Sequence, residues 1–457
     1  MRVLIAAHGF PPNQAAGAEW RAYRTARSLA VAGHDVQVVA VDRTDVSANA
    51  GVIVNDAVLD GVPVRRWSLA SDTRPGAVDE FDNPRMGAAL ADVLDAFRPD
   101  VLHIISGYRL TASVIGAARA AYVPMVITLT DFWFLCPRIS LRRSTGELCT
   151  VPDDPLECAL CVAGEQRRYR LPLKLLRGRL RRALVALWPR GTLARGHVNV
   201  LHSTMVQRRL RMAAALGHVE RLIAPSRFLA RLFEQHGAAR GQVVYMRQGV
   251  NSAGWTPVDA TPARSAVHIG YIGQIAEHKG IFDLVPAFRS LPHGATQARL
   301  LVYGDHEHAW PIYRQRLMHA VGGDARVVVM GPFDNPSVRQ IHANLDVLVV
   351  PSRWYENSPN VILEAFACGT PVIAANLGGM AELVDDGVNG LLFEPGNRRD
   401  LARCLRQMVD DAGLRAKLRA GMPPVRTLED ERAELIELYE EVTRAHRNAQ
   451  RLDMYAF

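Results

Sequence analysis

Residues 351–390, PSRWYENSPNVILEAFACGTPVIAANLGGMAELVDDGVNG, form the stretch that decides the fold. They follow LDVLVV, an apolar run that is typical of a buried parallel strand. Ser358 is expected to be the N-cap of a helix whose first residue is Pro359. This helix is predicted over residues 359–367 and ends before Gly369. A strand, a loop and a helix in this order are the repeating unit of a doubly wound α/β sheet.

Two acidic residues lie on either side of this helix start. Glu356 is in the loop before the helix, and Glu364 is inside it. Between them, the backbone N–H groups of Asn360 and Val361 lack partners within the helix, so they form an anion site. Carboxylates around an anion site suit a ligand that has both phosphate and hydroxyl groups, such as a nucleotide sugar. The alternative is an ordinary strand–loop–helix unit with incidental surface acids, and spacing alone leaves both open.

The composition indicates a globular protein of more than one domain. The chain has 457 residues, of which 49% are hydrophobic and 22% charged. It begins with a strand, RVLIAA, without a charged and apolar leader before it. It contains no uninterrupted apolar run of ~18 residues, so we expect no transmembrane helix and a cytoplasmic location.

Strand and helix patterns alternate in two separate series. The first series lies within residues 1–255 and the second within residues 263–425, with a proline-rich linker, TPVDATPAR, near their junction. A charged amphipathic helix is expected within residues 426–457. The sequence therefore predicts two doubly wound, Rossmann-like domains that face a cleft, with a last helix that packs back on the first domain.

The start of the first domain is a βαβ unit whose loop contains Gly17. This loop lacks the full G-x-G-x-x-G pattern, so a bound dinucleotide is poorly supported. Gly17 allows a sugar or phosphate to approach the backbone, or it simply permits a tight turn, and this element alone leaves the two interpretations even. Further along, Thr130 and Asp131 follow a predicted strand, at the sheet edge where ligands of such folds bind.

A cysteine-rich insertion is predicted over residues 132–165. Its four cysteines have the spacing C-x12-C-x8-C-x2-C, which in a reducing compartment is typical of a zinc site: Cys136, Cys149, Cys158 and Cys161. We expect a structural zinc ion that holds an otherwise irregular segment with little core of its own. The alternative is four reduced thiols without a metal.

A basic segment follows the insertion. From residue 166 to 219 there are 13 Lys or Arg and no Asp or Glu, whereas the whole chain has a net charge of +8. Residues 166–190 predict a cationic amphipathic helix, which would suit an anionic membrane surface. The alternatives are an ordinary core helix with a solvated face and, least favoured, a nucleic-acid site, since few aromatic residues are available to stack on bases.

The second domain repeats the same pattern and carries Lys279 in its first loop, just before a helix. A lysine there can neutralise a pair of phosphates, although a single loop lysine is more often merely solvated.

Several motifs together resemble family 4 of the retaining GT-B glycosyltransferases. The resemblance covers nearly the whole chain and is carried by ENSPNVILEA with its E-x7-E spacing, by IGQIAEHKG, APSRFLARLF and the AAGAE loop, and by GTPVIAANLGGMAELVDDGVNGLLFEPGN. It implies a nucleotide-sugar donor held mainly by the second domain and an acceptor held mainly by the first. It also implies transfer by same-face displacement, in which the leaving phosphate oxygen accepts the proton of the acceptor and no catalytic metal is needed.

The resemblance also implies roles for individual residues of the second domain. Glu364 is expected to bind the ribose hydroxyls and Glu356 the hydroxyls of the transferred sugar. The amides near Asn360 and Val361 would bind the pyrophosphate, and Lys279 would stabilise the leaving diphosphate. Gly331 is expected to border the base, and Gly17, in the first domain, belongs to a loop that closes over the phosphate.

Two positions depart from the family pattern. Gln274 stands where members often carry an arginine, and Thr130 stands where many carry a histidine that contacts the donor sugar. Asp131 is the neighbouring polar candidate. Because the other site residues match, these departures favour a different sugar specificity over a loss of activity.

The predicted function is therefore a metal-independent retaining glycosyltransferase of the hexosyltransferase type, acting in cell-surface polysaccharide or secondary-metabolite synthesis. Its acceptor would be a glycan, a lipid-linked sugar or a small molecule. We expect it in the cytoplasm or at the inner face of the plasma membrane, without a nucleic-acid partner. The alternatives are a GT-B epimerase or hydrolase of nucleotide sugars and a non-catalytic, membrane-associated scaffold.

Overall fold

The chain divides into two compact units. The structure is a computed structural model and describes residues 1–14, 16–43, 52–69, 76–152, 154–167, 169–171, 197–252, 255, 265–292, 297–334 and 337–454. Unit 1 comprises Met1–Pro225, Leu229–Met246 and Glu431–Phe457, and unit 2 comprises Ser226–Phe228 and Arg247–Asp430. The predicted linker over residues 256–264 lies outside the described residues, as does most of the predicted basic helix over residues 166–190.

Unit 1 is built on a sheet of eight strands in the order β3-β4-β2-β1-β5-β6-β7-β8. All neighbouring strands are parallel except β3 and β4, which are antiparallel. In chain order the strands are β1 (Arg2–Ala7), β2 (Asp35–Arg43), β3 (Val52–Leu59), β4 (Val62–Leu69), β5 (Val101–Ile105), β6 (Met125–Thr128), β7 (Arg221–Ala224) and β8 (Val243–Tyr245). The sheet order reverses at β1, whose neighbours are β2 and β5, so this is a topological switch point.

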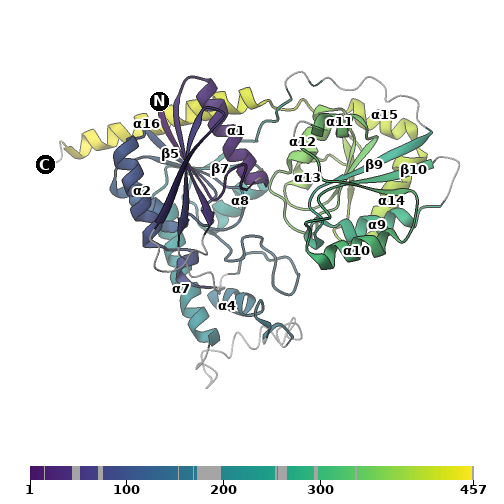
Figure 1. Cartoon of the computed structure of the whole chain (residues 1–457), viewed down its shortest axis with the longest axis horizontal. Helices are drawn as coiled ribbons and strands as arrows, with labels where there is room; N and C mark the ends of the chain where they lie inside the picture. Colours follow the sequence, from purple (N-terminus) through teal and green to yellow (C-terminus); the bar gives the residue numbers. More distant parts are fainter. Residues whose placement is uncertain are drawn as a thin grey trace. The chain divides into compact units, whose positions relative to one another are not determined.

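Helices cover this sheet (Figure 1). They are α1 (Gly17–Val31), α2 (Pro84–Phe97), α3 (Thr111–Ala120), α7 (His197–Leu216), α8 (Arg227–His236) and α16 (Leu428–Met454), whereas a further helix, α4 (Pro155–Ala163), packs against α7 and not on the sheet. One hydrophobic core joins α1 and α16 to alternate residues of the central strands, such as Val3 and Ile5 of β1. Because side chains alternate along a strand, the intervening residues point to the other face of the sheet.

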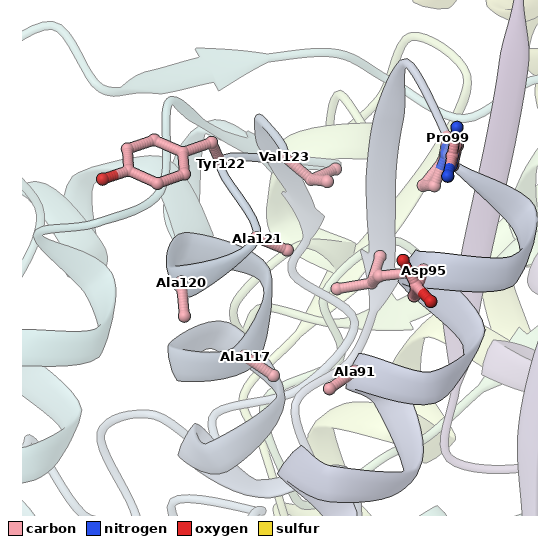
Figure 2. A pocket seen from close by; sticks show the side chains of 10 residues that line it. Ala91, Asp95, Pro99, Ala117, Ala120, Ala121, Tyr122 and Val123 are labelled. Atoms are coloured by element: carbon pink, nitrogen blue, oxygen red, sulfur yellow. The ribbon is translucent and has the colours of Figure 1, made fainter.

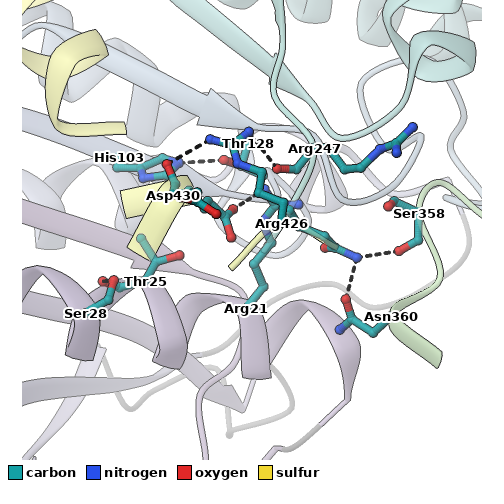
Figure 3. A network of polar contacts seen from close by, with 12 residues as sticks. Arg21, Thr25, Ser28, His103, Thr128, Arg247, Ser358, Asn360, Arg426 and Asp430 are labelled. Atoms are coloured by element: carbon teal, nitrogen blue, oxygen red, sulfur yellow. Dashed lines mark hydrogen bonds and ion pairs between the residues drawn. The ribbon is translucent and has the colours of Figure 1, made fainter. Parts of the chain in front are cut away.

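The last helix, α16, is an integral part of unit 1. Leu435, Leu438, Tyr439 and Val442 are buried in the same core as α1. The Tyr439 hydroxyl lies 2.5 Å from Nδ1 of the buried His103, whose Nε2 lies 2.7 Å from Oγ1 of Thr128; Figure 3 shows the latter pair. Burial lowers the pKa of His103 to about 3, so the ring is neutral and joins the helix to the sheet.

The cysteine-rich insertion has a core of its own, which corrects the prediction of an irregular segment. Helix α4 packs against α7, and apolar side chains of both form a separate buried cluster, which contains Leu156, Ala159, Leu160, Val162, Ala163, Leu201 and Met205. Arg208 of α7 is buried beneath the start of the insertion, where its guanidinium donates a hydrogen bond to the Trp133 carbonyl and stacks 5.6 Å from the ring centroid. A metal is therefore not needed to explain how this segment folds.

Unit 2 contains a six-stranded parallel sheet in the order β11-β10-β9-β12-β13-β14. Its strands are β9 (Ala266–Ile272), β10 (Gln297–Tyr303), β11 (Val327–Gly331), β12 (Val347–Val350), β13 (Val372–Ala375) and β14 (Gly390–Phe393). The helices are α9 (Ile281–Arg289), α10 (Pro311–Val321), α11 (Val338–Ala343), α12 (Asn360–Ala367), α13 (Met380–Leu383), α14 (Arg398–Asp410) and α15 (Ala412–Ala420). One hydrophobic core runs through the sheet and its helices, and the switch point lies at β9, between β10 and β12.

The predicted α/β class with two doubly wound sheets is confirmed. In the part of the chain that the structure describes, no helix is both long and apolar enough to cross a membrane.

Candidate active site

The two loops at the switch point of unit 2 and helix α12, which follows one of them, carry most of the predicted catalytic and donor-binding residues. Strands β9 and β12 are adjacent and parallel, so their carboxyl ends meet at one edge of the sheet. The chain leaves β9 through the loop that contains Lys279, and it leaves β12 through the loop that contains Glu356. In open α/β sheets, ligands bind at this edge, where the strand order reverses.

Lys279 and Glu356 form an ion pair. The Lys279 Nζ lies 2.7 Å from Oε1 of Glu356, and both side chains are largely buried. The Lys279 ammonium also lies 5.0 Å from the ring centroid of Trp354. The structure thus brings together two residues that are 77 positions apart in the sequence.

Two further groups hold the same carboxylate, and sequence reasoning missed both. Ser352 Oγ and Trp354 Nε1 each donate a hydrogen bond of 2.8 Å to Oε1 of Glu356. Burial alone would raise the pKa of Glu356, but the Lys279 charge and the hydrogen bonds from Lys279, Trp354 and Ser352 outweigh it and lower the pKa below its ordinary value. Glu356 is therefore held as a carboxylate. The sequence feature that could have pointed to Trp354 is its position two residues before Glu356, in the loop that follows β12 at the sheet edge.

The Glu356 loop is fixed against the start of α9. Arg353 and Arg398 both form ion pairs with the buried Asp283 of α9. The Arg353 N–H donates 2.8 Å to the His278 carbonyl, which ties the two loops directly. At the same place Gly280 has φ +75°, and a Cβ there would lie 1.8 Å from the Pro351 carbonyl oxygen. Only glycine fits this approach.

The start of helix α12 differs from the prediction. Its N-cap is Pro359, with Asn360 as the first helical residue and no side-chain cap. Ser358 is thus wrong as the N-cap, and its hydroxyl is buried without a hydrogen-bond partner. The Ser358 carbonyl instead accepts from the Gln248 side-chain amide at 2.5 Å, because the loop turns toward that residue.

Gln248 also donates to the Asn360 side-chain oxygen, so one amide fixes both ends of the turn before α12 (Figure 3). The backbone N–H groups of Asn360 and Val361 occupy the first turn, where an α-helix provides no internal acceptors. One turn further, Glu364 lies with Oε2 3.9 Å from Nε2 of the buried His342. The first turn of α12 therefore presents donors, and Glu364 presents an acceptor.

Gln274 and Gly331 lie in neighbouring loops of the same unit. The Gln274 side chain is exposed, and the Gln274 backbone carbonyl accepts a 2.6 Å hydrogen bond from the buried Tyr271 hydroxyl. Gly331 ends β11 with φ +85°, and its carbonyl accepts a hydrogen bond of 2.9 Å from Gly304. Both residues therefore shape loops through their backbones.

The predicted site residues of unit 1 lie at the corresponding edge of the first sheet. Asp131 accepts hydrogen bonds from Ser106 Oγ and from the Trp133 N–H at 2.8 Å, and Thr130 Oγ1 lies 3.3 Å from the same carboxylate. Gly17 begins α1 in open space, since beyond its own helix and chain neighbours no atom of the described residues lies within 4 Å of the position of a Cβ. The backbone at Gly17 is therefore accessible rather than crowded.

A second carboxylate at this edge received no role from the sequence. Glu19, in the first turn of α1, lies with Oε1 3.2 Å from Nε2 of His8, just after β1. Burial would raise the pKa of Glu19, but the hydrogen bond and charge of His8 lower it overall, with a smaller contribution from Arg109. The sequence feature that could have pointed to Glu19 is its position two residues after Gly17, in the loop region already selected.

The predicted metal site is not supported. Within the described residues, no group of three or more His, Cys, Asp or Glu side chains is arranged to hold a metal ion. The four cysteines of the insertion are free, and burial raises the pKa of three of their thiols: Cys136, Cys149 and, to about 12, Cys158. These observations fit the alternative of reduced, protonated thiols.

One pocket of about 570 Å³ lies elsewhere, between the carboxyl ends of α2 and α3 (Figure 2). It is lined largely by small side chains such as Ala91, Ala117 and Ala120, with Asp95 at its border. It adjoins the amino ends of β5 and β6, opposite the sheet edge that carries Thr130 and Asp131. It therefore contributes nothing to the candidate site.

Two family models match the chain. The model described as a glycosyl transferase 4-like domain matches residues 16–249, and the model described as glycosyl transferases group 1 matches residues 266–411. The chain belongs to this glycosyltransferase family. The predicted resemblance is thereby confirmed, and so is the coarser prediction that the chain is a glycosyltransferase.

Curated relatives of this glycosyltransferase agree over most of their length. Glycogen synthase of Mycobacterium tuberculosis is 25% identical over 414 residues, which cover 90% of this chain and 86% of the relative. The GDP-mannose-dependent alpha-mannosyltransferase of Corynebacterium glutamicum is 24% identical over 403 residues, with coverages of 86% and 77%. The glycosyltransferase is thus similar to enzymes of different named activities.

Solved structures share the fold of the glycosyltransferase. Sucrose-phosphate synthase of Thermosynechococcus elongatus has a TM-score of 0.68 at 21% identity, with coverage of 97% of this chain and 99% of that one. Anabaena HepE in complex with UDP-glucose has a TM-score of 0.62 at 17% identity, with coverage of 96% and 100%. At these identities the likeness concerns the fold alone.

Proposed function

We propose that this chain is a retaining glycosyltransferase that takes a sugar from a nucleotide-diphosphate sugar. The observation that carries the proposal is the Lys279–Glu356 ion pair at the switch point of unit 2, beside the first turn of α12. It places a cation, a carboxylate and free N–H donors at one sheet edge. A diphosphate would bind to the cation and the N–H donors, and sugar hydroxyls would donate hydrogen bonds to the carboxylate.

Each residue has a distinct role in this proposal. Lys279 and the amides of Asn360 and Val361 stabilise the departing diphosphate by charge and hydrogen bonding. Glu356 accepts hydrogen bonds from the transferred sugar, and Glu364 accepts them from the ribose. Gln274 and Gly331 border the nucleotide through their loops.

The proposed reaction is a same-face displacement. The bond between the anomeric carbon and the phosphate oxygen breaks, and the leaving oxygen takes the proton of the acceptor hydroxyl. The acceptor oxygen then bonds to the anomeric carbon on the face that the phosphate left. Because Lys279 and the helix amides meet the developing negative charge, this route requires no catalytic metal.

Unit 1 would hold the acceptor, a glycan, lipid-linked sugar or small molecule of cell-surface or secondary-metabolite synthesis. Gly17, Thr130 and Asp131 lie at the ligand-binding edge of the same sheet, where Gly17 would approach the donor phosphate and Thr130 and Asp131 the transferred sugar. A sugar hydroxyl suits the Asp131 carboxylate, which has acceptor capacity beyond its bonds to Ser106, Thr130 and Trp133.

Removing the Lys279 ammonium tests the proposal. We expect Lys279→Ala to reduce kcat by ~10²–10³-fold, the typical effect of losing one group that stabilises developing charge. Turnover would be measured as glycoside and free nucleotide formed from a panel of UDP-, GDP- and ADP-sugars. Lys417→Ala is the matched control, since Lys417 is exposed on α15 and should leave turnover unchanged.

Three results would contradict the proposal. Equal turnover by Lys279→Ala and the wild type would exclude Lys279 from the site. Free nucleotide or an isomerised sugar without any glycoside would indicate a hydrolase or epimerase, and lack of nucleotide binding would indicate a scaffold.

We also propose a peripheral contact with anionic lipid, on sequence grounds. The supporting observation is the run of 13 Lys or Arg without Asp or Glu between residues 166 and 219. Each such cation near an anionic surface contributes ~1 kcal/mol. Sedimentation with phosphatidylserine vesicles should carry the protein down at low salt, and equal sedimentation with neutral vesicles would refute an electrostatic contact.

A further inference from the structure

His342 on α11 is a buried imidazole without hydrogen bonds from its ring. Its exposed fraction is 0%, and neither Nδ1 nor Nε2 has a hydrogen-bond partner among the described residues. Buried polar side chains in native proteins nearly always have a partner, and an exception calls for an explanation. The proposed reaction assigns nothing to this ring.

The nearest acidic group to the ring nitrogens is the Glu364 carboxylate of α12. Its Oε2 lies 3.9 Å from His342 Nε2, which is too long for a hydrogen bond. The backbone of His342 is fixed, because its buried carbonyl accepts from Thr370 Oγ1 at 3.1 Å. Glu364 keeps 17% of its side chain exposed, so the carboxylate can rotate toward the ring while the ring stays in place.

We propose that His342 is a positioning residue that holds Glu364 when a nucleotide binds. In the bound state Nε2–H donates to Oε2 of Glu364, and the carboxylate presents its remaining lone pairs to the vicinal ribose hydroxyls. An ionised carboxylate has about four acceptor positions, so one bond from His342 leaves room for two hydroxyls. The inference rests on the proposed function, in which Glu364 accepts hydrogen bonds from the ribose hydroxyls.

This arrangement explains why an unpaired imidazole persists at this position. A small rotation of the Glu364 side chain would bring its carboxylate within hydrogen-bond distance of the ring. Nucleotide binding fixes the carboxylate and satisfies the ring in the same step. His342 itself touches no substrate atom, so its effect must pass through Glu364.

The geometry specifies which substitutions retain the effect. Gln places its amide nitrogen near the position of Nε2, whereas Asn reaches only the position of Nδ1. His342→Gln should therefore keep the bond to Glu364, and His342→Asn should lose it. His342→Phe retains the ring shape without any donor.

The test measures recognition of the ribose, which a purely structural role would not change. The wild type is first screened with UDP, GDP and ADP by calorimetry. The tightest of these is then compared with its 2′-deoxy form, and the ratio of the two Kd values is determined for each variant. We expect a ratio of ~10–100 in the wild type, the effect of one hydrogen bond to a charged group.

The expected results are specific to each variant. The ratio should fall toward ~1–3 in His342→Phe and His342→Asn and in Glu364→Gln, and it should stay near the wild-type value in His342→Gln. The proposal is overturned if well-folded Phe and Asn variants keep the wild-type ratio. If His342→Phe does not fold, the difference between Asn and Gln decides.

The outcome separates this inference from the function beneath it. If the wild type binds none of the three nucleoside diphosphates, both fail. If the wild type binds and discriminates, and Glu364→Gln loses the discrimination while every His342 variant keeps it, the proposed function stands and the role of His342 falls.

Discussion

At the scale of single residues, the charges of Lys279 and Glu356 compensate each other within the candidate site. The Lys279 ammonium is paired with the Glu356 carboxylate, and the same Glu356 oxygen accepts hydrogen bonds from Ser352 and Trp354. An incoming diphosphate must therefore compete with a carboxylate for the lysine, and the sugar must compete with the lysine for the carboxylate. Positioning by Ser352 and Trp354 keeps Glu356 in place during this exchange.

The lowered pKa of Glu356 leads to a prediction about activity in acid. Its carboxylate stays charged as the pH falls, until the pH reaches its depressed pKa. Trp354→Phe removes one of the bonds that lower this pKa, so the loss of kcat/KM in acid should begin at a higher pH than in the wild type. A pH–rate profile from pH 4 to 8 measures this.

Trp310→Phe is the control for that experiment, because Trp310 is 75% exposed and remote in sequence from the site. If kcat/KM falls at the same acidic pH in Trp354→Phe and Trp310→Phe, the Trp354 indole does not lower the pKa of Glu356.

At the scale of elements, the junction of two loops depends on Gly280. A Cβ at this position would meet the Pro351 carbonyl at 1.8 Å, and φ is +75°. We expect Gly280→Ala to lower the unfolding free energy by about 1–3 kcal/mol and to reduce turnover, because the Glu356 loop must move away from α9. Urea unfolding and kcat measure the two effects.

Gly323 provides a close match for this substitution. It has the same φ of +75°, but nothing lies within 4 Å of its Cβ position. Gly323→Ala should therefore show the backbone strain alone and normal turnover. If Gly280→Ala and Gly323→Ala have the same unfolding free energy and the same kcat, the contact between the loops does not contribute to function.

The joint between α16 and the first sheet predicts a dependence of stability on pH. His103 is neutral when folded, with its pKa lowered to about 3 from an ordinary value of 6.5. Unfolding then binds a proton below pH 6.5, so the stability that the neutral ring provides is present above that pH and is lost as the pH falls toward 3. Between about pH 6 and 4 the slope from this one group is ~1.4 kcal/mol per pH unit.

His103→Gln should remove this contribution from the slope of unfolding free energy against pH, measured by urea unfolding. His308→Gln is the control, since the His308 side chain is 84% exposed. An unchanged slope in His103→Gln would mean that the ring is not held neutral by burial.

The sequence predicted most elements because their patterns are strong. The two series of alternating apolar strand and helix patterns indicated both doubly wound sheets, and Gly369 marked the end of helix α12. It missed β3 because most of the side chains of this edge strand are exposed and show no alternation. It misplaced the cap of α12 because Ser358 has a good capping side chain, but a tertiary bond from Gln248 decides how the loop turns.

For the candidate site, the sequence identified charged residues but not their mutual contacts. Lys279 and Glu356 were both selected, whereas their direct pairing depends on β9 and β12 being neighbours in the sheet. Ser352 and His342 carried no local pattern, since their importance comes from what lies beside them in the fold.

At the scale of the whole molecule, unit 1 is made of separated chain segments and includes the last 27 residues. Ending the chain at Asp430 would remove Leu435, Leu438, Tyr439 and Val442 from the core of unit 1. Burying each such side chain contributes ~1.5–3 kcal/mol, so their joint loss should unfold unit 1. Unit 2, which retains all of its segments, should remain folded.

Calorimetry of this truncated chain should show one remaining thermal transition, and limited proteolysis should leave a protected fragment beginning near Arg247. A peptide of residues 428–454 added in trans should restore some protection to the first 225 residues. Full cooperative unfolding of both units in the truncated chain would contradict this account.

The return of α16 to the first sheet also sets an order of events on the ribosome. The segment from Arg247 to Asp430 is continuous and can fold as it emerges, whereas the earlier half must wait for the final helix. At typical translation speeds the roughly 200 residues in between take on the order of 10–40 s. During that interval the strands of the amino-terminal sheet are complete but α16 is missing, so an apolar face of the sheet stays exposed and we expect chaperones to bind it. A chain that ends before α16 would therefore keep this apolar face exposed, and we expect it to be degraded.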